Sequence, residues 1–368
     1  NGVTNGRDGK GVIYVKSAMN NWDYYDPDFE GGKYIYCGET AMPGAFSERM
    51  SCSDTSYEGA HNFPYSIIVA ALHAGNYASQ EKSTYSTPGA SMWVSAFGGE
   101  GGYWHPTITT TDNSSCSKGY VRSDSNRAPT LDNQGNHPDN PNCNYTAGFN
   151  GTSSAAPMVA GVVALMLEKN PNLTWRDVKH ILATTSVPID LSMSKTISSI
   201  TQYSWVTNAA GYKHHSWYGF GKIDAAAAVS AASSYTASSL GTFVTTGDLS
   251  TGTIEEAIDF GTKTKTMSIS SPAGSDNKIE FIRVGLKISH SKPQHLGYRL
   301  TSPDGTTVPL LTPYTAISGG RNNDLYSIGV SSLYGESIGG TWILSLDDYT
   351  DDGTNGDLTE WRMEIYGH

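Results

Sequence analysis

A polar loop meets the longest apolar helical run of the chain at Asn-Gly-Thr-Ser-Ser-Ala-Ala-Pro, residues 150–157, and the helix is expected to continue over residues 158–167. Ser153 at this junction has small neighbours, a backbone N–H in the first turn of the helix and the positive end of the helix dipole behind it. This environment suits a nucleophile that attacks a carbonyl carbon. The alternative is a plain helix start, with Thr152 or Ser153 as N-cap and Pro157 in the first turn.

The pattern Gly-Thr-Ser-x-Ala-x-Pro is far more specific than a helix start, because its five fixed positions should coincide by chance about once in a million starts. It resembles the nucleophile motif of subtilisin-like serine proteases, and the resemblance makes Ser153 the nucleophile. The similarity continues through the apolar helix and through Asn-Leu-Thr-Trp-Arg-Asp, residues 172–177, which is similar to the kexin and furin branch. The resemblance implies a serine endopeptidase that acts on peptide or protein substrates, with a preference for basic residues.

Length and charge limit the class of protein. A chain of 368 residues predicts about two domains. No apolar run reaches the roughly 18 residues of a membrane span, and a formal net charge of −11 would repel nucleic acid and anionic membranes. We therefore expect neither nucleic acid nor a membrane as partner. No basic-then-apolar leader opens the sequence, so any signal peptide or pro-segment is expected outside these residues.

Four cysteines lie in polar loops without zinc-ligand spacing. We predict two disulfides, Cys37 with Cys52 and Cys116 with Cys143, because each pair shares one irregular segment. Disulfides favour an oxidising compartment, so the protein is expected to be secreted, periplasmic or extracellular. Four free thiols are the alternative.

A short β-branched run, residues 11–15, predicts a buried strand that leads to Ser-Ala-Met-Asn, residues 17–20. In subtilisin-like enzymes such a strand ends on an asparagine whose amide donates to the oxyanion, and the resemblance makes Asn20 that residue. Met19 stands where the family usually has glycine, and Asn21 is the alternative donor. Without the resemblance, an asparagine after a strand is more often a turn residue.

Residues 21–60 carry eight acidic side chains against two basic ones. In kexin-like proteases this segment contributes acidic residues to the pocket for the basic side chain before the scissile bond. Asp26 matches one such position, and Asp54 and Glu58 compete for the other. A solvated acidic loop is the alternative. The substrate-binding candidates are thus Asp26, Asp54 and Glu58, together with Ser17, Ala18 and Met19 ahead of the oxyanion asparagine.

The periodicity divides the chain into an α/β part and an all-β part. An apolar strand at residues 65–71, an amphipathic helix capped by Thr174 and an Ala-rich helix that ends near Ser234 are followed by an Ala/Ser-rich linker at residues 231–239. Short strands of period two then predict a sandwich, and its motifs at residues 301–306, 339–342 and 361–367 resemble the jelly-roll P domain of kexin and furin. The predicted fold is therefore a partial subtilisin-like parallel sheet with helices, residues 1–235, followed by a P domain, residues 241–368.

Two further expectations concern calcium and the catalytic dyad. Asp347, Asp348, Asp351, Asp352 and Asp357 could ligate a structural Ca²⁺ ion, although a solvated acidic loop is the favoured reading. None of the ten histidines stands in a His-Gly-Thr context. We therefore predict that the triad His and Asp belong to an N-terminal part of the catalytic domain outside this chain. A non-catalytic binding or scaffold protein that retains the fold is the alternative.

Overall fold

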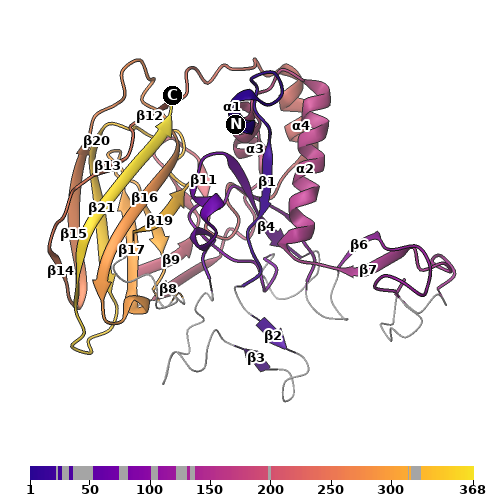
Figure 1. Cartoon of the computed structure of the whole chain (residues 1–368), viewed down its shortest axis with the longest axis horizontal. Coiled ribbons are helices and arrows are strands. Elements are labelled where there is room, and N and C mark those ends of the chain that lie inside the picture. Colours follow the sequence, from indigo (N-terminus) through magenta and orange to yellow (C-terminus); the bar gives the residue numbers. More distant parts are fainter. Residues whose placement is uncertain are drawn as a thin grey trace.

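The computed structural model describes residues 1–21, 24–26, 33–35, 53–73, 82–100, 107–121, 131–132, 137–197, 200–313, 315 and 325–368. The chain forms an α/β lobe, which runs to the end of helix α4 at Ser234, and a β-sandwich lobe, which begins with strand β12 at Val244. The two lobes lie side by side (Figure 1). This is the predicted fold class, with helices and a parallel sheet first and a sandwich second.

The α/β lobe is built on a three-stranded parallel sheet in the order β1-β4-β5, which comprises Tyr14–Ser17, Ser66–Leu72 and Val94–Phe97. Strand β4 reads Ser-Ile-Ile-Val-Ala-Ala-Leu, and six of its seven residues are buried. Such a continuous apolar run is typical of a parallel strand that is covered on both faces. Helix α2, Thr152–Lys169, packs on all three strands.

Helix α3, Trp175–Thr185, confirms the predicted cap at Thr174. The Thr174 hydroxyl accepts from the Asp177 backbone N–H, and the Asp177 carboxylate accepts from the Thr174 backbone N–H at 2.8 Å. This reciprocal capping box satisfies two donors that the first helical turn leaves unpaired. The apolar face of α3, with Val178 and Ile181 fully buried, joins the core of the lobe.

The predicted linker is wrong at its beginning. Helix α4 spans Ala225–Ser234, so residues 231–234 finish a helix instead of starting a connection. Alanine has the highest helix propensity, and the buried Ala228 and Ala232 hold α4 in the core. Only residues 235–243 connect the lobes without regular structure, and the domain limits at 235 and 241 stay a prediction.

The α/β lobe also contains shorter elements. Strands β2 with β3, β6 with β7, β8 with β9 and β10 with β11 form antiparallel pairs. The elements are α1 (Gly2–Asn5), β2 (Tyr24–Asp26), β3 (Lys33–Ile35), η1 (Thr55–Tyr57), η2 (Gly59–Asn62), β6 (Ile108–Thr111), β7 (Tyr145–Phe149), β8 (Ser194–Ile197), β9 (Ile200–Ser204), β10 (Val206–Thr207) and β11 (Lys213–His214).

The β-sandwich lobe packs two antiparallel sheets. One has the order β12-β21-β16-β19, with β13 and β14 also paired to β21, and the other has the order β15-β20-β17-β18. Their inner faces bury Trp342 and Trp361 completely. The elements are β12 (Val244–Thr245), β13 (Leu249–Ser250), β14 (Glu256–Ile258), β15 (Gly261–Ile269), β16 (Ile279–His290), η3 (Pro293–His295), β17 (Leu296–Thr301), β18 (Thr307–Leu311), β19 (Tyr326–Val330), β20 (Gly340–Asp348) and β21 (Gly356–Gly367).

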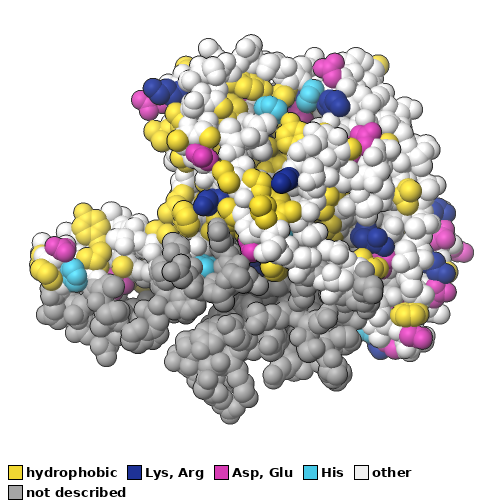
Figure 2. Space-filling view, turned by 180° about the vertical axis from the view of Figure 1, so that it is seen from behind, with side chains coloured by type: hydrophobic (Ala, Val, Ile, Leu, Met, Phe, Trp, Pro, Cys, Tyr) yellow, Lys and Arg dark blue, Asp and Glu magenta, His cyan; other side chains and the backbone are white. Residues whose placement is uncertain are grey.

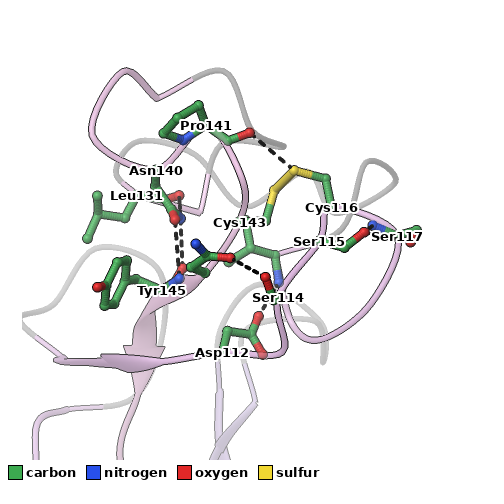
Figure 3. Close-up of a disulfide and its surroundings, with 12 residues drawn as sticks. Asp112, Ser114, Ser115, Cys116, Ser117, Leu131, Asn140, Pro141, Cys143 and Tyr145 are labelled. Carbon is green, nitrogen blue, oxygen red and sulfur yellow. Dashed lines mark hydrogen bonds between the residues drawn. A yellow bond between two sulfur atoms is a disulfide. The ribbon is translucent and has the colours of Figure 1, made fainter.

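Strands β6 and β7 form an arm that projects from the α/β lobe (Figure 1) and that one predicted disulfide closes. Cys116 is bonded to Cys143, and the Asn140 amide donates to the carbonyl oxygens of Leu131 and Tyr145 at 2.8 and 2.7 Å (Figure 3). The second predicted pair, Cys37 with Cys52, lies outside the described residues. We expect peptide mapping under non-reducing conditions to recover it, and a free thiol at either position would contradict that pairing.

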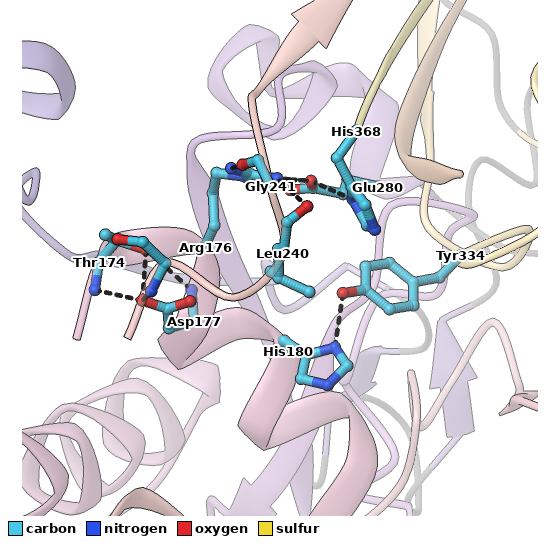
Figure 4. A network of polar contacts seen from close by, with 10 residues as sticks. Thr174, Arg176, Asp177, His180, Leu240, Gly241, Glu280, Tyr334 and His368 are labelled. Atoms are coloured by element: carbon cyan, nitrogen blue, oxygen red, sulfur yellow. Dashed lines mark hydrogen bonds and ion pairs between the residues drawn. The ribbon is translucent and has the colours of Figure 1, made fainter. Parts of the chain in front are cut away.

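A buried ion pair joins the lobes. The Arg176 Nε on α3 donates to both carboxylate oxygens of Glu280 on β16 at 3.0 and 2.9 Å, and His368 Nδ1 lies 2.8 Å from Glu280 Oε1 (Figure 4). Burial would raise the pKa of Glu280, but the hydrogen bonds from His368 and Arg176 outweigh it and hold that pKa below its ordinary value. The ionised carboxylate is therefore the form that connects the two lobes.

We expect Glu280→Gln to destabilise the chain by about 3 kcal/mol, because it leaves the Arg176 guanidinium buried without its counter-charge. The contribution of Glu280 is fully present above the ordinary pKa of a glutamate and is lost as the pH falls through its lowered pKa. Thermal unfolding at several pH values measures both effects. The exposed Glu255 offers the control Glu255→Gln, and equal stability of the two variants would contradict the prediction.

Apolar side chains reach the surface at several described positions of both lobes. On the face behind Figure 1, hydrophobic side chains gather in the upper middle of the view (Figure 2). On α2, Met158 and Leu165 are 38% and 49% exposed.

In the part of the chain that the structure describes, no helix combines the length and apolar character that crossing a membrane requires.

Candidate active site

Ser153 is the second residue of α2, at the carboxyl end of the parallel sheet. Gly151 precedes the helix with φ +101°, a conformation that strains any residue with a Cβ atom. Thr152 and Ser154 are buried, whereas Ser153 is exposed. The Ser153 hydroxyl therefore faces outward from the helix start, and it makes no hydrogen bond within the described residues. This is the exposure that a nucleophile needs.

Asn20 lies beside this helix start. Its Oδ1 accepts from the backbone N–H and from the hydroxyl of Thr152, each at 2.8 Å. Because both interactions engage the oxygen, the amide Nδ2 keeps its two N–H donors for another acceptor. Asn21 instead donates its backbone N–H to Thr87 Oγ1 at 2.9 Å. Of the two asparagines considered from the sequence, Asn20 is the one that contacts the nucleophile loop.

Met19 and Thr87 fix the approach to Asn20. Met19 adopts φ +78°, which costs a residue other than glycine about 1–2 kcal/mol. Thr87 binds the backbone on both sides of Asn20, since its N–H donates to Met19 O at 3.2 Å and its hydroxyl accepts from Asn21 N–H. The sequence indicated Met19 as a departure from glycine, but it gave no sign of the contact with Thr87, which is 66 residues away from Asn21.

The remaining substrate-binding candidates separate into two groups. Ser17 ends β1 opposite Val69, and the backbone of Ala18 extends the pairing through a 3.0 Å bond to Val69 O. Asp26 ends β2 opposite Lys33 of β3 in a separate hairpin. The structure thus places Ser17, Ala18 and Met19 directly before Asn20, and it describes Asp26 by its backbone alone.

Asp54 and Glu58 have partners within the chain. Asp54 is buried, and its Oδ1 accepts from Ser56 N at 2.9 Å and from Ser56 Oγ at 2.6 Å. Glu58 forms an ion pair with Lys16 at 3.4 Å, and this charge lowers the pKa of Glu58. Asp54 therefore caps η1, and Glu58 neutralises a cation on β1. A role in substrate binding stays a prediction for both.

The described histidines offer Ser153 no hydrogen-bonded base. Burial lowers the pKa of His61 and of His214 to about 4 and that of His215 to about 3, so these three are neutral at physiological pH. His61 contacts Thr55 O at 2.9 Å, and His214 contacts Met92 O at 2.8 Å. These two rings therefore contact backbone carbonyl oxygens of the α/β lobe and make no hydrogen bond to Ser153.

Two of the acidic residues considered for calcium, Asp347 in β20 and Asp352 in the loop after it, are bound by basic side chains. Asp347 accepts from two guanidinium nitrogens of Arg299, each at 2.8 Å, and Asp352 accepts from Lys292 Nζ at 2.6 Å. A carboxylate that is already paired with a cationic side chain is a poor ligand for a metal cation. Within the described residues there is no cluster of three or more His, Cys, Asp or Glu side chains that could hold a metal ion.

Residues 1–221 match the Subtilase family, and residues 279–365 match the proprotein convertase P-domain. The chain is 26% identical to an extracellular serine protease of Aeromonas sobria, across 98% of the chain and 62% of that relative. It is 35% identical to rat proprotein convertase subtilisin/kexin type 6, across 60% of the chain and 23% of that relative. The chain thus spans less than two thirds of the length of these relatives.

A crystal structure of a serine protease of Aeromonas sobria superposes with a TM-score of 0.83 at 25% identity, covering 98% of this chain and 65% of that one. Together with the match over residues 1–221, this likeness confirms the resemblance that the sequence carries around Ser153. The chain belongs to the subtilase family and combines a subtilase domain with a P-domain of the kind found in furin and kexin-like proteases.

Proposed function

We propose that this chain carries the nucleophile and the oxyanion site of a secreted kexin-like serine endopeptidase. One observation supports the assignment most directly. Thr152 binds Asn20 Oδ1 through two donors, and the next residue along the helix is the exposed Ser153. An amide whose oxygen is fixed presents its N–H donors in a constant direction, which is what an oxyanion site requires.

In this proposal the Ser153 hydroxyl attacks the carbonyl carbon of the scissile peptide bond. Asn20 Nδ2 and the Ser153 backbone N–H donate to the oxygen, which becomes negatively charged in the tetrahedral intermediate. A histidine oriented by an aspartate takes the hydroxyl proton and passes it to the leaving amine. We assign both residues to the N-terminal part of the catalytic domain, the partner of this chain.

A fluorophosphonate probe tests the proposal, because it reacts with a serine only where a base and an oxyanion site activate the hydroxyl. In the full-length protein we expect one labelled peptide, which contains Ser153, and no label in the Ser153→Ala variant. A folded full-length protein that takes up no probe at Ser153 would favour a non-catalytic role.

We propose that the enzyme prefers Lys or Arg before the scissile bond, since residues 21–60 carry a surplus of negative charge. Asp26→Asn should then lower kcat/KM for basic peptides about tenfold or more, while leaving apolar peptides unaffected. The comparison of two peptide series that differ only in that residue measures the effect. If the unmodified enzyme cleaves the basic and the apolar peptides with equal kcat/KM, the acidic residues at 21–60 do not determine its specificity.

Secretion and a structural calcium ion complete the proposal. Secretion is supported by the Cys116–Cys143 disulfide and by the extracellular protease of Aeromonas sobria to which the chain is similar. Calcium is proposed as a stabilising cofactor outside the ion-paired loop after β20. Removal of calcium by a chelator should lower the midpoint of thermal unfolding of the full-length protein, and an unchanged midpoint would withdraw calcium from the proposal.

A further inference from the structure

The hydroxyl of Tyr85 touches the nucleophile loop. Tyr85 Oη accepts from the Gly151 backbone N–H at 2.8 Å, and it lies 2.8 Å from Gly98 O and 2.6 Å from Gly99 O. A phenol has one proton, which can be donated to these carbonyl oxygens while the oxygen accepts from Gly151. Tyr85 thus links the loop after β5 to the residue two positions before Ser153.

Ser154 holds the other side of the same glycine. Its hydroxyl lies 2.7 Å from Gly151 O and 2.9 Å from Gly98 O. Gly98 approaches so closely that a Cβ atom there would lie 2.8 Å from Gly151 O. The N–H and the C=O of Gly151 are therefore both fixed, each by a hydroxyl group that also contacts the loop after β5.

This fixation matters because glycine has the largest conformational freedom of any residue. Gly151 leads directly into Thr152, whose N–H and hydroxyl bind Asn20. A rotation of the Gly151 peptide groups would displace Thr152 and, with it, the position of Asn20 relative to Ser153. A displacement of about 1 Å in an active site can reduce a rate about 10²-fold.

We propose that Tyr85 is a positioning residue for acyl transfer, which acts with Ser154 to hold Gly151 and thereby aligns Asn20 with Ser153. The inference rests on the proposed function of Ser153 and extends it to residues that touch no substrate. Phenylalanine can fill the volume of the Tyr85 ring, but it cannot accept from the Gly151 N–H. Burial raises the pKa of Tyr85 to about 12, so its hydroxyl stays neutral over the working range of a protease.

The test compares fluorophosphonate labelling of the full-length protein with that of its Tyr85→Phe variant, over a range of probe concentrations. We expect the maximal labelling rate constant to fall about tenfold to a hundredfold, with an unchanged half-saturating probe concentration and an unchanged pH profile. Tyr218→Phe is the matched control, because Tyr218 is fully buried in the same lobe and its hydroxyl donates to Asp190 at 2.9 Å. That control should label at the wild-type rate.

The possible failures are distinguishable. No labelling of Ser153 in the wild-type protein would overturn the proposed function itself. Wild-type labelling together with an unchanged rate in folded Tyr85→Phe would overturn the positioning role alone. If Tyr85→Phe does not fold, Ser154→Ala takes its place, with an expected decrease of about tenfold, and an unchanged rate in that variant overturns the inference. When all variants fold, the two substitutions should be non-additive.

Discussion

Residues 1–368 expressed alone should cleave peptides no faster than a Ser153→Ala variant of the same residues. A serine hydroxyl without a general base is a poor nucleophile at neutral pH, and in subtilisin the loss of the histidine costs about 10⁶ in kcat. The described histidines make no hydrogen bond to Ser153, and the three most deeply buried in the α/β lobe are held neutral. Cleavage of a dibasic fluorogenic peptide measures the rate.

Addition of the upstream polypeptide should restore Ser153-dependent turnover. The matched control is the same mixture with Ser153→Ala, which should stay inactive. Turnover by residues 1–368 alone that disappears in Ser153→Ala would mean that one of the ten histidines is the base, and the assignment of the dyad to another part of the protein would be wrong.

The surface of the α/β lobe predicts how residues 1–368 behave when they are expressed alone. Within the described residues β1 pairs only with β4, so no described strand covers its other edge. The neighbouring helix α2 lies at the outer side of the lobe (Figure 1), and Met158 and Leu165 on this helix are partly exposed. An open strand edge beside exposed apolar side chains favours association. We therefore expect residues 1–368 alone to aggregate or to bind the upstream polypeptide.

Local signals in the sequence account for much of this fold. The cap of α3 at Thr174 and the short strands of the sandwich each depend on residues that are close in the chain, and these predictions are confirmed. The N-cap of α2 is Gly151, whereas the sequence offered Thr152 or Ser153. The Ala-rich helix that ends near Ser234 is confirmed, but the linker predicted from residue 231 overlaps its last turn because alanine and serine are common in both. Only the packing of Ala228 and Ala232 in the core decides for the helix.

Contacts between distant segments could not be predicted in the same way. Asn20 was a candidate through the family resemblance, but its bonds to Thr152 span 132 residues, and nothing near either residue indicates them. Asp54 is a candidate for a substrate pocket through the same resemblance, a role that stays a prediction, and the structure buries its carboxylate as a cap for η1. The composition of a segment gives its net charge. Only the fold shows which of its carboxylates accept hydrogen bonds from nearby backbone N–H groups.

Asn20→Ala should lower kcat about 10²–10³-fold, because it removes one donor to the oxyanion while leaving Ser153 in place. Asn20→Asp should be more damaging than Asn20→Ala. Its carboxylate can still accept from Thr152 N–H, at the position where Asn20 Oδ1 lies 2.8 Å away. The second carboxylate oxygen then replaces the Nδ2 donor, and it places negative charge beside the developing oxyanion.

Asn21→Ala is the matched control, since it removes an adjacent asparagine side chain but keeps the backbone N–H that binds Thr87. We expect its kcat to equal that of the wild type, and we expect KM to change little in all three variants, because the oxyanion forms only in the transition state. A loss of kcat in Asn21→Ala with normal activity in Asn20→Ala would move the oxyanion donor by one residue. The bonds between Asn20 and Thr152 would then serve only to hold the start of α2.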